Sequence, residues 1–348
     1  MTHRSLFRIL SAAVSWTVLA SSPTRVQPSR QFLPQTYYNT FSHVHMPLAR
    51  IRPGDAVATR MLDASGRDEQ GAQRASPPNP LTGPFYVEGA EPGDAIAVRF
   101  TGVRLNRNWG FSNYRLGLYS LLPDAIESLY PNRYKPGEII KERTSVVPWD
   151  IDLARQVVHL REPASGVLKM EFPVKPMLGC VGVAPAGDFA PTSAPAGSYG
   201  GNLDYNEIGE GTTVILPVYH PGALLFVGDG HALQGDGEPT GTGVETSMDV
   251  EFTVDVHKKA NLTGPRAETA EYLISIGAQP EFVSSMNRAL EMATTDMVAW
   301  LTSDYKLEPW AAHLLIGYQG KYDIVTVAGS IALKIPKSRL APAARAAR

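Results

Sequence analysis

The sequence is short of cysteine, of net charge and of long apolar runs. Its 348 residues include one cysteine, Cys180, which excludes an intrachain disulfide and a cysteine-rich zinc module. The formal net charge is −2 and no dense Lys/Arg stripe occurs, which argues against nucleic acid or an anionic membrane as a partner. No run of about 18 apolar residues occurs, so no membrane-spanning helix is predicted.

The first thirty residues have the pattern of an export signal. A basic start with Arg4 and Arg8 precedes a mostly apolar or small stretch from Ile9 to Ala20. Val18-Leu19-Ala20 suits cleavage by signal peptidase. A disordered N-terminal tail is the alternative, and in both cases residues 1–30 lie outside the fold. We expect a periplasmic or secreted protein if the segment is a signal, and a cytoplasmic one if it is not.

Glycine and proline are plentiful, with 31 and 28 residues. Such frequent chain punctuation suits many short strands joined by tight turns. Pro-Gly-Asp turns at 53–55 and 92–94 each precede a strand-like run, at 56–59 and 95–100. The segment 63–80 between them is polar and rich in glycine and proline. We predict a long loop there, and long ordered loops in compact domains are often functional.

Apolar periodicity predicts strands first and helices late. Strict alternation over 248–256 is the clearest strand signal, and apolar residues at steps of three and four predict an amphipathic helix over 281–303. Pro309 starts a second helix. Further strands are predicted at 168–172, 213–218, 324–327 and 331–335. The expected fold is therefore mainly β, with α+β at the margin, in one domain over 31–338 followed by a disordered tail over 339–348.

Reactive side chains concentrate in residues 199–245. Gly228–Glu238 reads GDGHALQGDGE, which places four glycines, three carboxylates, one imidazole and one amide in a single loop. Glycine lets backbone N–H groups approach a ligand closely, and carboxylates with imidazole are ligands that divalent cations select. Asp204 adds a further carboxylate after the flexible Gly200-Gly201. A solvated turn is the alternative, but the carboxylates do not match an EF-hand register.

Three segments resemble signatures of the acetamidase/formamidase family. They are TGPFYVEGAEPGD at 82–94, PMLGCVGVAP at 176–185 and GGNLDYNEIGEGTTVILPVYHPGALLFVGDGHALQGDGE at 200–238. The resemblance runs over roughly residues 35–335. It implies a β-sandwich-like fold with a few C-terminal helices, a homo-oligomer that we expect to be a dimer, and metal-assisted hydrolysis of short-chain amides. Cyclic amides are an open extension of that substrate class.

The resemblance also marks candidate site residues. The matching positions are Glu88, Asn202, Asp204, Asp229, His231, Gln234, Asp236 and Glu238. As metal ligands we expect His231 and Asp204, with His45 as the third, around zinc or, as the alternative, calcium. His43 competes with His45 for that place.

The remaining roles concern proton transfer and charge stabilisation. Glu88 or Glu238 is expected to carry the proton, and Asp229 to act beside His231, where orienting the histidine is the alternative to binding metal. The backbone of Gly228 and Gly230, with the side chains of Gln234 and Asn202, is expected to contact substrate and stabilise an oxyanion.

Each of these residues also has a purely structural interpretation. Glu88 would otherwise cap a turn, Asp204 would bond the preceding glycine backbone, and Cys180 in its apolar run is expected to be a core residue. Two other amidase chemistries find no support. A serine amidase needs paired serines in a glycine-rich run, and here they occur only outside such runs. A nitrilase-type site needs a cysteine on a charged loop, and Cys180 does not lie on one. The alternative function is a non-catalytic secreted protein that binds a metal or ligand on the same fold.

Overall fold

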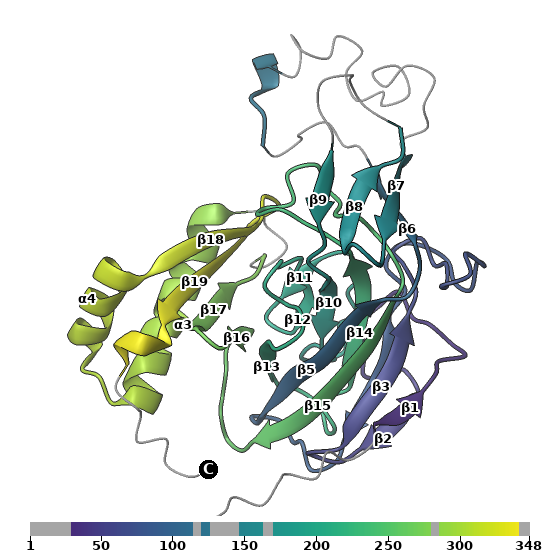
Figure 1. Ribbon diagram of the computed structural model, residues 1–348. Helices are drawn as coiled ribbons and strands as arrows, with labels where there is room; N and C mark the ends of the chain where they lie inside the picture. The colour runs from purple at the N-terminus through teal and green to yellow at the C-terminus, as the bar shows by residue number, and fades with distance from the viewer. Residues whose placement is uncertain (1–28, 114–119, 126–145, 163–169, 280–284, 341–348) are drawn as a thin grey trace, which may run out of the picture.

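A computed structural model describes residues 29–113, 120–125, 146–162, 170–279 and 285–340 (Figure 1). Residues 1–28 of the predicted N-terminal segment lie outside these residues, as do Leu168, Phe282 and the chain after Leu340, whereas Arg30, which the sequence placed outside the fold, begins the first strand. Within the described ranges, no helix is long and apolar enough to cross a membrane. Most of the ordered elements are strands, so the predicted mainly β fold is confirmed.

The largest sheet has nine strands and contains the predicted strand at 248–256. Its order is β1 (Arg30–Phe32), β3 (Ala56–Met61), β15 (Met248–His257), β5 (Ala95–Leu105), β13 (Thr213–Pro217), β16 (Arg266–Glu268), β17 (Tyr272–Gly277), β19 (Ser330–Pro336) and β18 (Lys321–Thr326). In β15 the apolar residues from Met248 to Val254 are buried and none of the charged ones is, as alternation requires. The strands after both Pro-Gly-Asp turns, β3 and β5, flank β15 on either side.

A second sheet of six strands packs against the first. Its order is β11 (Ala196–Gly197), β12 (Gly200–Asn202), β10 (Met177–Gly182), β14 (Leu225–His231), β4 (Thr82–Val87) and β2 (Ala49–Ile51). Phe85 of this sheet meets Phe252 of β15 edge to face, with ring centroids 5.3 Å apart. Every residue of β10 and β14 is buried, so these strands lie at the centre of the protein.

A small third sheet stands at one end of the molecule (Figure 1). It contains β6 (Trp109–Asn113), β7 (Val146–Asp152), β8 (Val157–Leu160) and β9 (Glu171–Pro173). The sequence predicts a half-buried strand at 168–172, but β9 is exposed throughout and Phe172 is 42% exposed. This edge strand pairs with β8 alone within the described residues, so no second layer covers Phe172.

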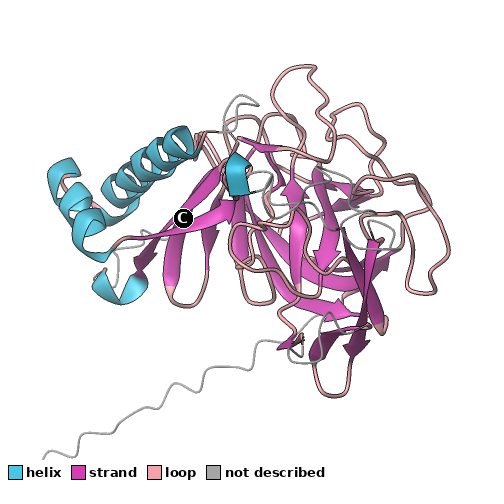
Figure 2. Cartoon of the chain, turned by 90° about the horizontal axis from the view of Figure 1, so that it is seen from above, coloured by secondary structure: helices cyan, strands magenta, loops and turns pink. Residues whose placement is uncertain are grey.

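The two long helices lie together on one side of the sheets, apart from a short helical turn at 123–125 (Figure 2). They are α3 (Met286–Tyr305) and α4 (Pro309–Gln319), with a short 3-10 turn η2 (Lys337–Arg339) after β19. The Ser285 hydroxyl caps α3 by accepting from the Arg288 N–H. Ala293, Met297 and Trp300 of α3 are buried as predicted, whereas Leu290 of the same predicted stripe is 41% exposed.

One predicted boundary is corrected at the centre of the fold. The sequence predicts a loop from Gly228, but β14 continues as a strand to His231. Gly228 lies opposite Cys180, and Gly230 lies opposite Leu178, in the ladder with β10. The glycines are needed there because a Cβ at Gly230 would fall 2.9 Å from both the Met248 side chain and the Thr246 carbonyl oxygen.

Candidate active site

Five ionisable side chains from four segments meet at the end of β14. Asp229 and His231 lie on β14, Asp204 follows β12, Glu238 lies in the loop after β14, and Glu245 precedes β15. Ligand atoms of Asp204, Asp229 and His231 lie within 4.8 Å of one another, and the same holds for His231, Glu238 and Glu245. His231 belongs to both groups. We call these five residues the carboxylate cluster.

The cluster rests on a glycine of β10. A Cβ at Gly179 would collide with Asp204 Oδ1 and Asp229 Oδ2. Glycine at position 179 therefore leaves the space in which both carboxylates lie over the strand. This accounts for Gly179 between the buried Leu178 and Cys180 in an otherwise apolar run.

The orientation of His231 follows from its hydrogen bonds. The Gln234 amide donates through Nε2 to the Asp204 carbonyl oxygen at 2.6 Å, so its Oε1 faces His231 Nδ1 at 2.8 Å. Because Oε1 only accepts, Nδ1 carries the proton. His231 Nε2 then points into the cluster, 3.1 Å from Glu245 Oε2 and 3.6 Å from Asp229 Oδ1. An outer partner on the other ring nitrogen is the usual support for a ligating histidine.

Four atoms of the cluster are buried and make no hydrogen bond within the described part of the chain. They are Asp204 Oδ1, Asp229 Oδ1, His231 Nε2 and Glu245 Oε2. Buried polar atoms without a partner are costly, so they call for a ligand. Carboxylate oxygens and one imidazole nitrogen form a donor set that suits a divalent cation, and the residues present therefore fit one.

The burial of like charges shifts the acidity of the cluster. Burial, strengthened by the neighbouring carboxylates, raises the pKa of Asp204 to about 7, that of Glu245 to about 8 and that of Glu238 to about 10. Burial alone would lower the pKa of His231, but Glu245 and Asp229 raise it well above its ordinary value. With no cation bound, the cluster thus holds extra protons at neutral pH.

Three of the carboxylate residues also have strained backbones. The φ angles are +47° at Asp204, +57° at Asp229 and +48° at Glu238. This left-handed region is unfavourable for residues other than glycine, although aspartate tolerates it better than most. Such conformations concentrate at functional sites, where the surrounding structure holds them in place.

Glu88 and His45 do not join the cluster. Glu88 Oε2 lies 3.4 Å from Arg52 Nε, and its side chain is 42% exposed. Its neighbour Val87 bonds Gly222, which precedes β14, whereas the cluster lies past the far end of that strand, about 20 Å along. His45 Nε2 lies 2.7 Å from Thr40 Oγ1, and its ring stacks on Tyr38.

The competing His43 and the acidic Asp236 also face elsewhere. The His43 ring stacks on His220, with centroids 4.4 Å apart. Asp236 is exposed and accepts a hydrogen bond from the Asn206 amide. The structure thus brings together His231, Asp204, Asp229 and Glu238 from the sequence-predicted set.

The residues predicted to contact an oxyanion hold the carboxylates instead. Asn202 Nδ2 donates to Asp204 Oδ2 at 2.6 Å, and Gln234 uses both ends of its amide on His231 and Asp204. Gly228 and Gly230 lie within the β10–β14 ladder rather than in an open loop. Cys180 is fully buried, as predicted, and burial raises the pKa of its thiol well above the ordinary value.

Glu245 is the functional residue that the sequence pattern does not single out. It is 3% exposed and bridges to His231 across two strands. The signal that could have identified it is a carboxylate inside the run Val244–Met248, which is buried throughout. Glu245 follows the predicted loop by seven positions, and only the pairing of β14 with the segment before β15 brings it back to His231.

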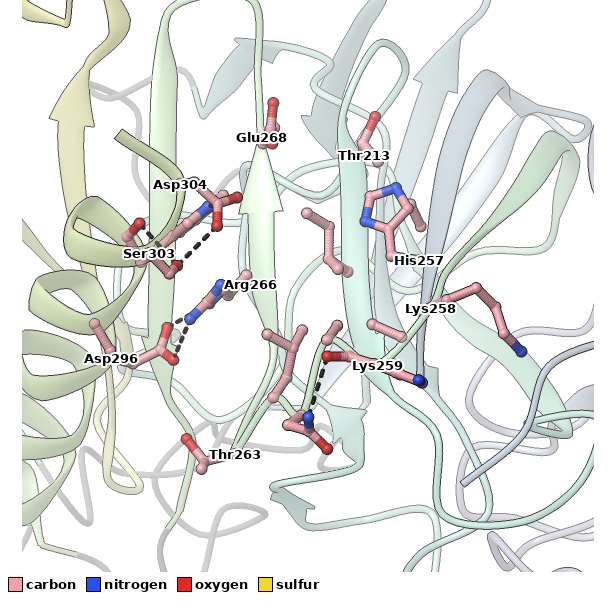
Figure 3. Close-up of a pocket in the computed structure, with 18 of the residues that line it drawn as sticks. Thr213, His257, Lys258, Lys259, Thr263, Arg266, Glu268, Asp296, Ser303 and Asp304 are labelled. Atoms are coloured by element: carbon pink, nitrogen blue, oxygen red, sulfur yellow. Dashed lines mark hydrogen bonds and ion pairs between the residues drawn. The ribbon is translucent and has the colours of Figure 1, made fainter. Parts of the chain in front are cut away.

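A groove lies elsewhere, between the nine-stranded sheet and α3 (Figure 3). It has a volume of about 870 Å³, and none of its lining residues belongs to the carboxylate cluster. Its wall includes the Arg266–Asp296 ion pair, at 2.8 Å, and the Arg266 guanidinium lies over the Trp300 ring. This groove therefore lies where α3 packs against the sheet, apart from the carboxylate cluster.

Comparison with known proteins identifies the family. The Acetamidase/Formamidase family profile matches residues 27–195 and 186–292. The chain belongs to the acetamidase/formamidase family. Membership places it among amidohydrolases, which act on amide carbon–nitrogen bonds.

The named relatives cover the chain to different extents. Acetamidase of Mycolicibacterium smegmatis is 26% identical over 299 residues, which is 70% of this chain and 73% of that protein. A Schizosaccharomyces pombe relative is 31% identical over 192 residues, and the match spans 45% of this chain and 46% of the relative's length.

Two solved structures agree in fold over nearly their whole length. Acetamidase from Bacillus halodurans has a TM-score of 0.72 and 26% identity, with 89% of this chain and 98% of that chain covered. Acetamidase from Yersinia enterocolitica has a TM-score of 0.73 and 28% identity, covering 91% of this chain and 94% of that one.

Proposed function

We propose that this protein hydrolyses short-chain amides to a carboxylate and ammonia at the carboxylate cluster. The observation that carries the proposal is the set of four buried ligand atoms at the end of β14 that lack a hydrogen bond within the described residues, two of which, His231 Nε2 and Glu245 Oε2, face each other at 3.1 Å. A divalent cation would be held by Asp204, Asp229 and His231, with Glu245 facing the same space. Zinc suits the mixed imidazole and carboxylate donors best, and calcium is the alternative.

The cation supplies Lewis acidity, which polarises an amide carbonyl and favours deprotonation of water. The chain supplies the proton carriers. Amide hydrolysis needs one group to take a proton from the attacking water and another to give a proton to the departing nitrogen. Glu238 and Glu245 both lie within ligand distance of His231, and burial raises the pKa of each carboxyl, so this part of the site can hold and release protons.

The sequence left Glu88 or Glu238 as the proton carrier, and here Glu238 is retained and Glu245 is added to it. Of Glu238 and Glu245, the carboxylate that is deprotonated takes a proton from water while the water oxygen bonds the carbonyl carbon of the amide. The protonated member gives its proton to nitrogen as the carbon–nitrogen bond breaks, so the products are a carboxylic acid and ammonia.

The test measures ammonia release together with bound metal. Formamide, acetamide and the cyclic amide 2-pyrrolidone serve as substrates, and elemental analysis identifies the metal. His231→Ala should lose both turnover and cation. Asp236→Asn, an exposed acid of the same loop, should keep both and is the matched control. Full turnover in the His231 variant contradicts the assignment, and a bound cation without ammonia from any amide supports a binding protein instead.

We also propose that the protein forms a homodimer through α4. Trp310, Leu314 and Tyr318 recur every four residues along one face of α4 and are 68%, 48% and 78% exposed. Tyr322 and Ile324 of the neighbouring edge strand β18 are also exposed. The three α4 side chains thus form one largely apolar face, and aromatic residues of this kind are enriched where proteins associate.

The chemistry of α4 favours a second copy as its occupant. The helix sequence PWAAHLLIGYQ contains no Asp, Glu, Lys or Arg, so a two-fold antiparallel crossing brings no like charges together. In that crossing Leu314 lies at the axis and Trp310 packs on Tyr318 of the other copy. The lack of Lys and Arg also disfavours an anionic membrane surface as the occupant.

Export to the periplasm or outside the cell is a further proposal. It depends on the basic and apolar pattern of residues 1–30 alone. Cell fractionation with N-terminal sequencing of the mature chain tests it. A mature protein that begins after Ala20 supports export, and an intact Met1 in the cytoplasm contradicts it.

A further inference from the structure

The long loop between β3 and β4 delivers an amide group to the carboxylate cluster. Asn79, near the end of this loop, places its Nδ2 3.2 Å from Asp229 Oδ2 and 3.5 Å from Asn202 Oδ1. Its φ of +42° turns the chain into the left-handed region at that point. Asn79 is thus the contact between the predicted functional loop and the carboxylates of the site.

The base of the loop is anchored to the segment that carries Glu245. Arg107 is almost fully buried and donates to Asp63 Oδ2 at 2.7 Å and to Thr246 Oγ1 at 3.0 Å. Thr246 follows Glu245, and the backbone N–H of Asn79 bonds the carbonyl of Ala64, which follows Asp63. One guanidinium therefore fixes the position of Glu245 relative to that of Asn79.

The tip of the loop is held as well. Asn39 Nδ2 donates to the carbonyl of Pro78 at 2.6 Å and to that of Ser76 at 2.9 Å. The Ser193 hydroxyl donates to the same Pro78 carbonyl at 3.0 Å. Asn79 therefore directly follows a backbone carbonyl that two side chains hold in place, and a precisely placed contact needs such support.

The amide donors select which carboxylate oxygens remain open. Asp229 Oδ2 is occupied by Asn79, and Asp204 Oδ2 is occupied by Asn202. Asn202 is itself oriented by donors at its Oδ1, from the Cys180 thiol at 3.0 Å and from Asn79. The other oxygen of each carboxylate, Oδ1, is the one that is buried and unpaired.

We propose that Asn79 is a positioning residue that turns the Oδ1 atoms of Asp229 and Asp204 toward the cation position. It acts on Asp229 directly and on Asp204 through Asn202. The inference rests on the proposed function of the cluster. It needs a neutral donor at position 79, because a further carboxylate beside Asp229 would repel it and could donate only when protonated.

The experiment compares Asn79→Ala and Asn79→Asp with the wild-type enzyme. Zn²⁺ affinity is measured by equilibrium dialysis, and kcat and KM for acetamide are measured across pH. Asn79→Ala should weaken zinc binding about 10–100-fold, the usual cost of losing an outer partner of a ligand. Asn79→Asp should shift the pH profile for kcat to lower pH, since only the protonated side chain donates.

The matched control is Gln73→Ala. The Gln73 amide ties the same loop together by donating to the carbonyls of Ser65 and Ala75, and it does not contact the cluster. Zinc affinity and pH profile of this variant should equal those of the wild type. Equal losses in Gln73→Ala and Asn79→Ala, or an unshifted profile in Asn79→Asp, overturn the proposal. If the wild type releases no ammonia, the proposed function fails, and the zinc affinities still decide the role of Asn79.

Discussion

At the scale of single residues, the cluster links proton binding to stability. The carboxyls of Glu238 and Glu245 keep their protons in the folded chain to pH values at which the unfolded chain has lost them. The free energy of unfolding therefore falls as pH rises from about 4.5 toward their folded pKa values. His231 acts with the same sign, because its raised pKa stabilises the folded state at low pH and that contribution is lost as pH rises.

We predict that chelator-treated protein becomes less stable between pH 5 and pH 8. Glu245→Gln removes one of the retained protons, so the slope should flatten by up to about 1.4 kcal/mol per pH unit. Chemical denaturation at several pH values measures the slope, and Asp236→Asn is the control that should leave it unchanged. A stability that is flat or rises over this range contradicts the cluster's electrostatics. Added Zn²⁺ should stabilise most at the higher pH, where ligands are deprotonated.

At the scale of elements, the loop after β3 depends on one buried ion pair. Arg107 and Asp63 are 1% and 0% exposed, and Asp63 Oδ1 also accepts from the backbone of Ser65 and Arg67. Replacing Arg107 alone leaves a buried charge without its partner. We predict that Arg107→Met lowers the free energy of unfolding by about 3–5 kcal/mol.

A double-mutant cycle by urea unfolding measures that coupling. Asp63→Asn keeps a side-chain oxygen for the Ser65 and Arg67 N–H groups, so the double variant should be more stable than Arg107→Met alone. Arg60→Met, at a partly exposed pair with Asp249, is the comparison and should cost about 1 kcal/mol or less from its ion pair. If Arg107→Met and Arg60→Met lower the free energy of unfolding by the same amount, burial of the ion pair does not explain the stability of this loop.

Element positions follow local patterns where one face is buried. Alternation identifies β15, and the glycine–proline punctuation identifies the turns before β3 and β5. Apolar periodicity predicts α3, and Pro309 marks the start of α4 as expected. The wrong details are Leu290 and Phe172, where periodicity gives a face but does not say whether another element covers it.

At the scale of the whole molecule, the exposed face of α4 predicts the oligomeric state. Leu314→Arg places a charge at the axis of the proposed two-fold crossing, where two copies would repel. The wild type should sediment as a dimer and the variant as a monomer with unchanged circular dichroism. Met46→Arg, at an exposed apolar residue far along the chain, should stay dimeric. A monomeric wild type, or a dimeric Leu314 variant, rules out this interface.

The sequence by itself determined much of the site's composition. His231, Asp229 and Glu238 lie in one glycine-rich stretch, and Asp204 follows a second, so their residue types alone indicated a cation and acid–base chemistry. The mainly β fold likewise follows from local pattern, because alternate residues of a strand share one face, and the buried Cys180 follows from its continuous apolar run.

Only the tertiary structure decided which groups meet. Glu245 pairs with His231 across strands, Asn79 arrives from a loop 150 positions before Asp229, and Glu88 stays at the opposite end of β14. These outcomes depend on strand order and register, which are set by packing across the whole sheet. Separation along the sequence does not determine that register. The types of ligand residue could therefore be predicted from the sequence, but the residues that meet them in space could not.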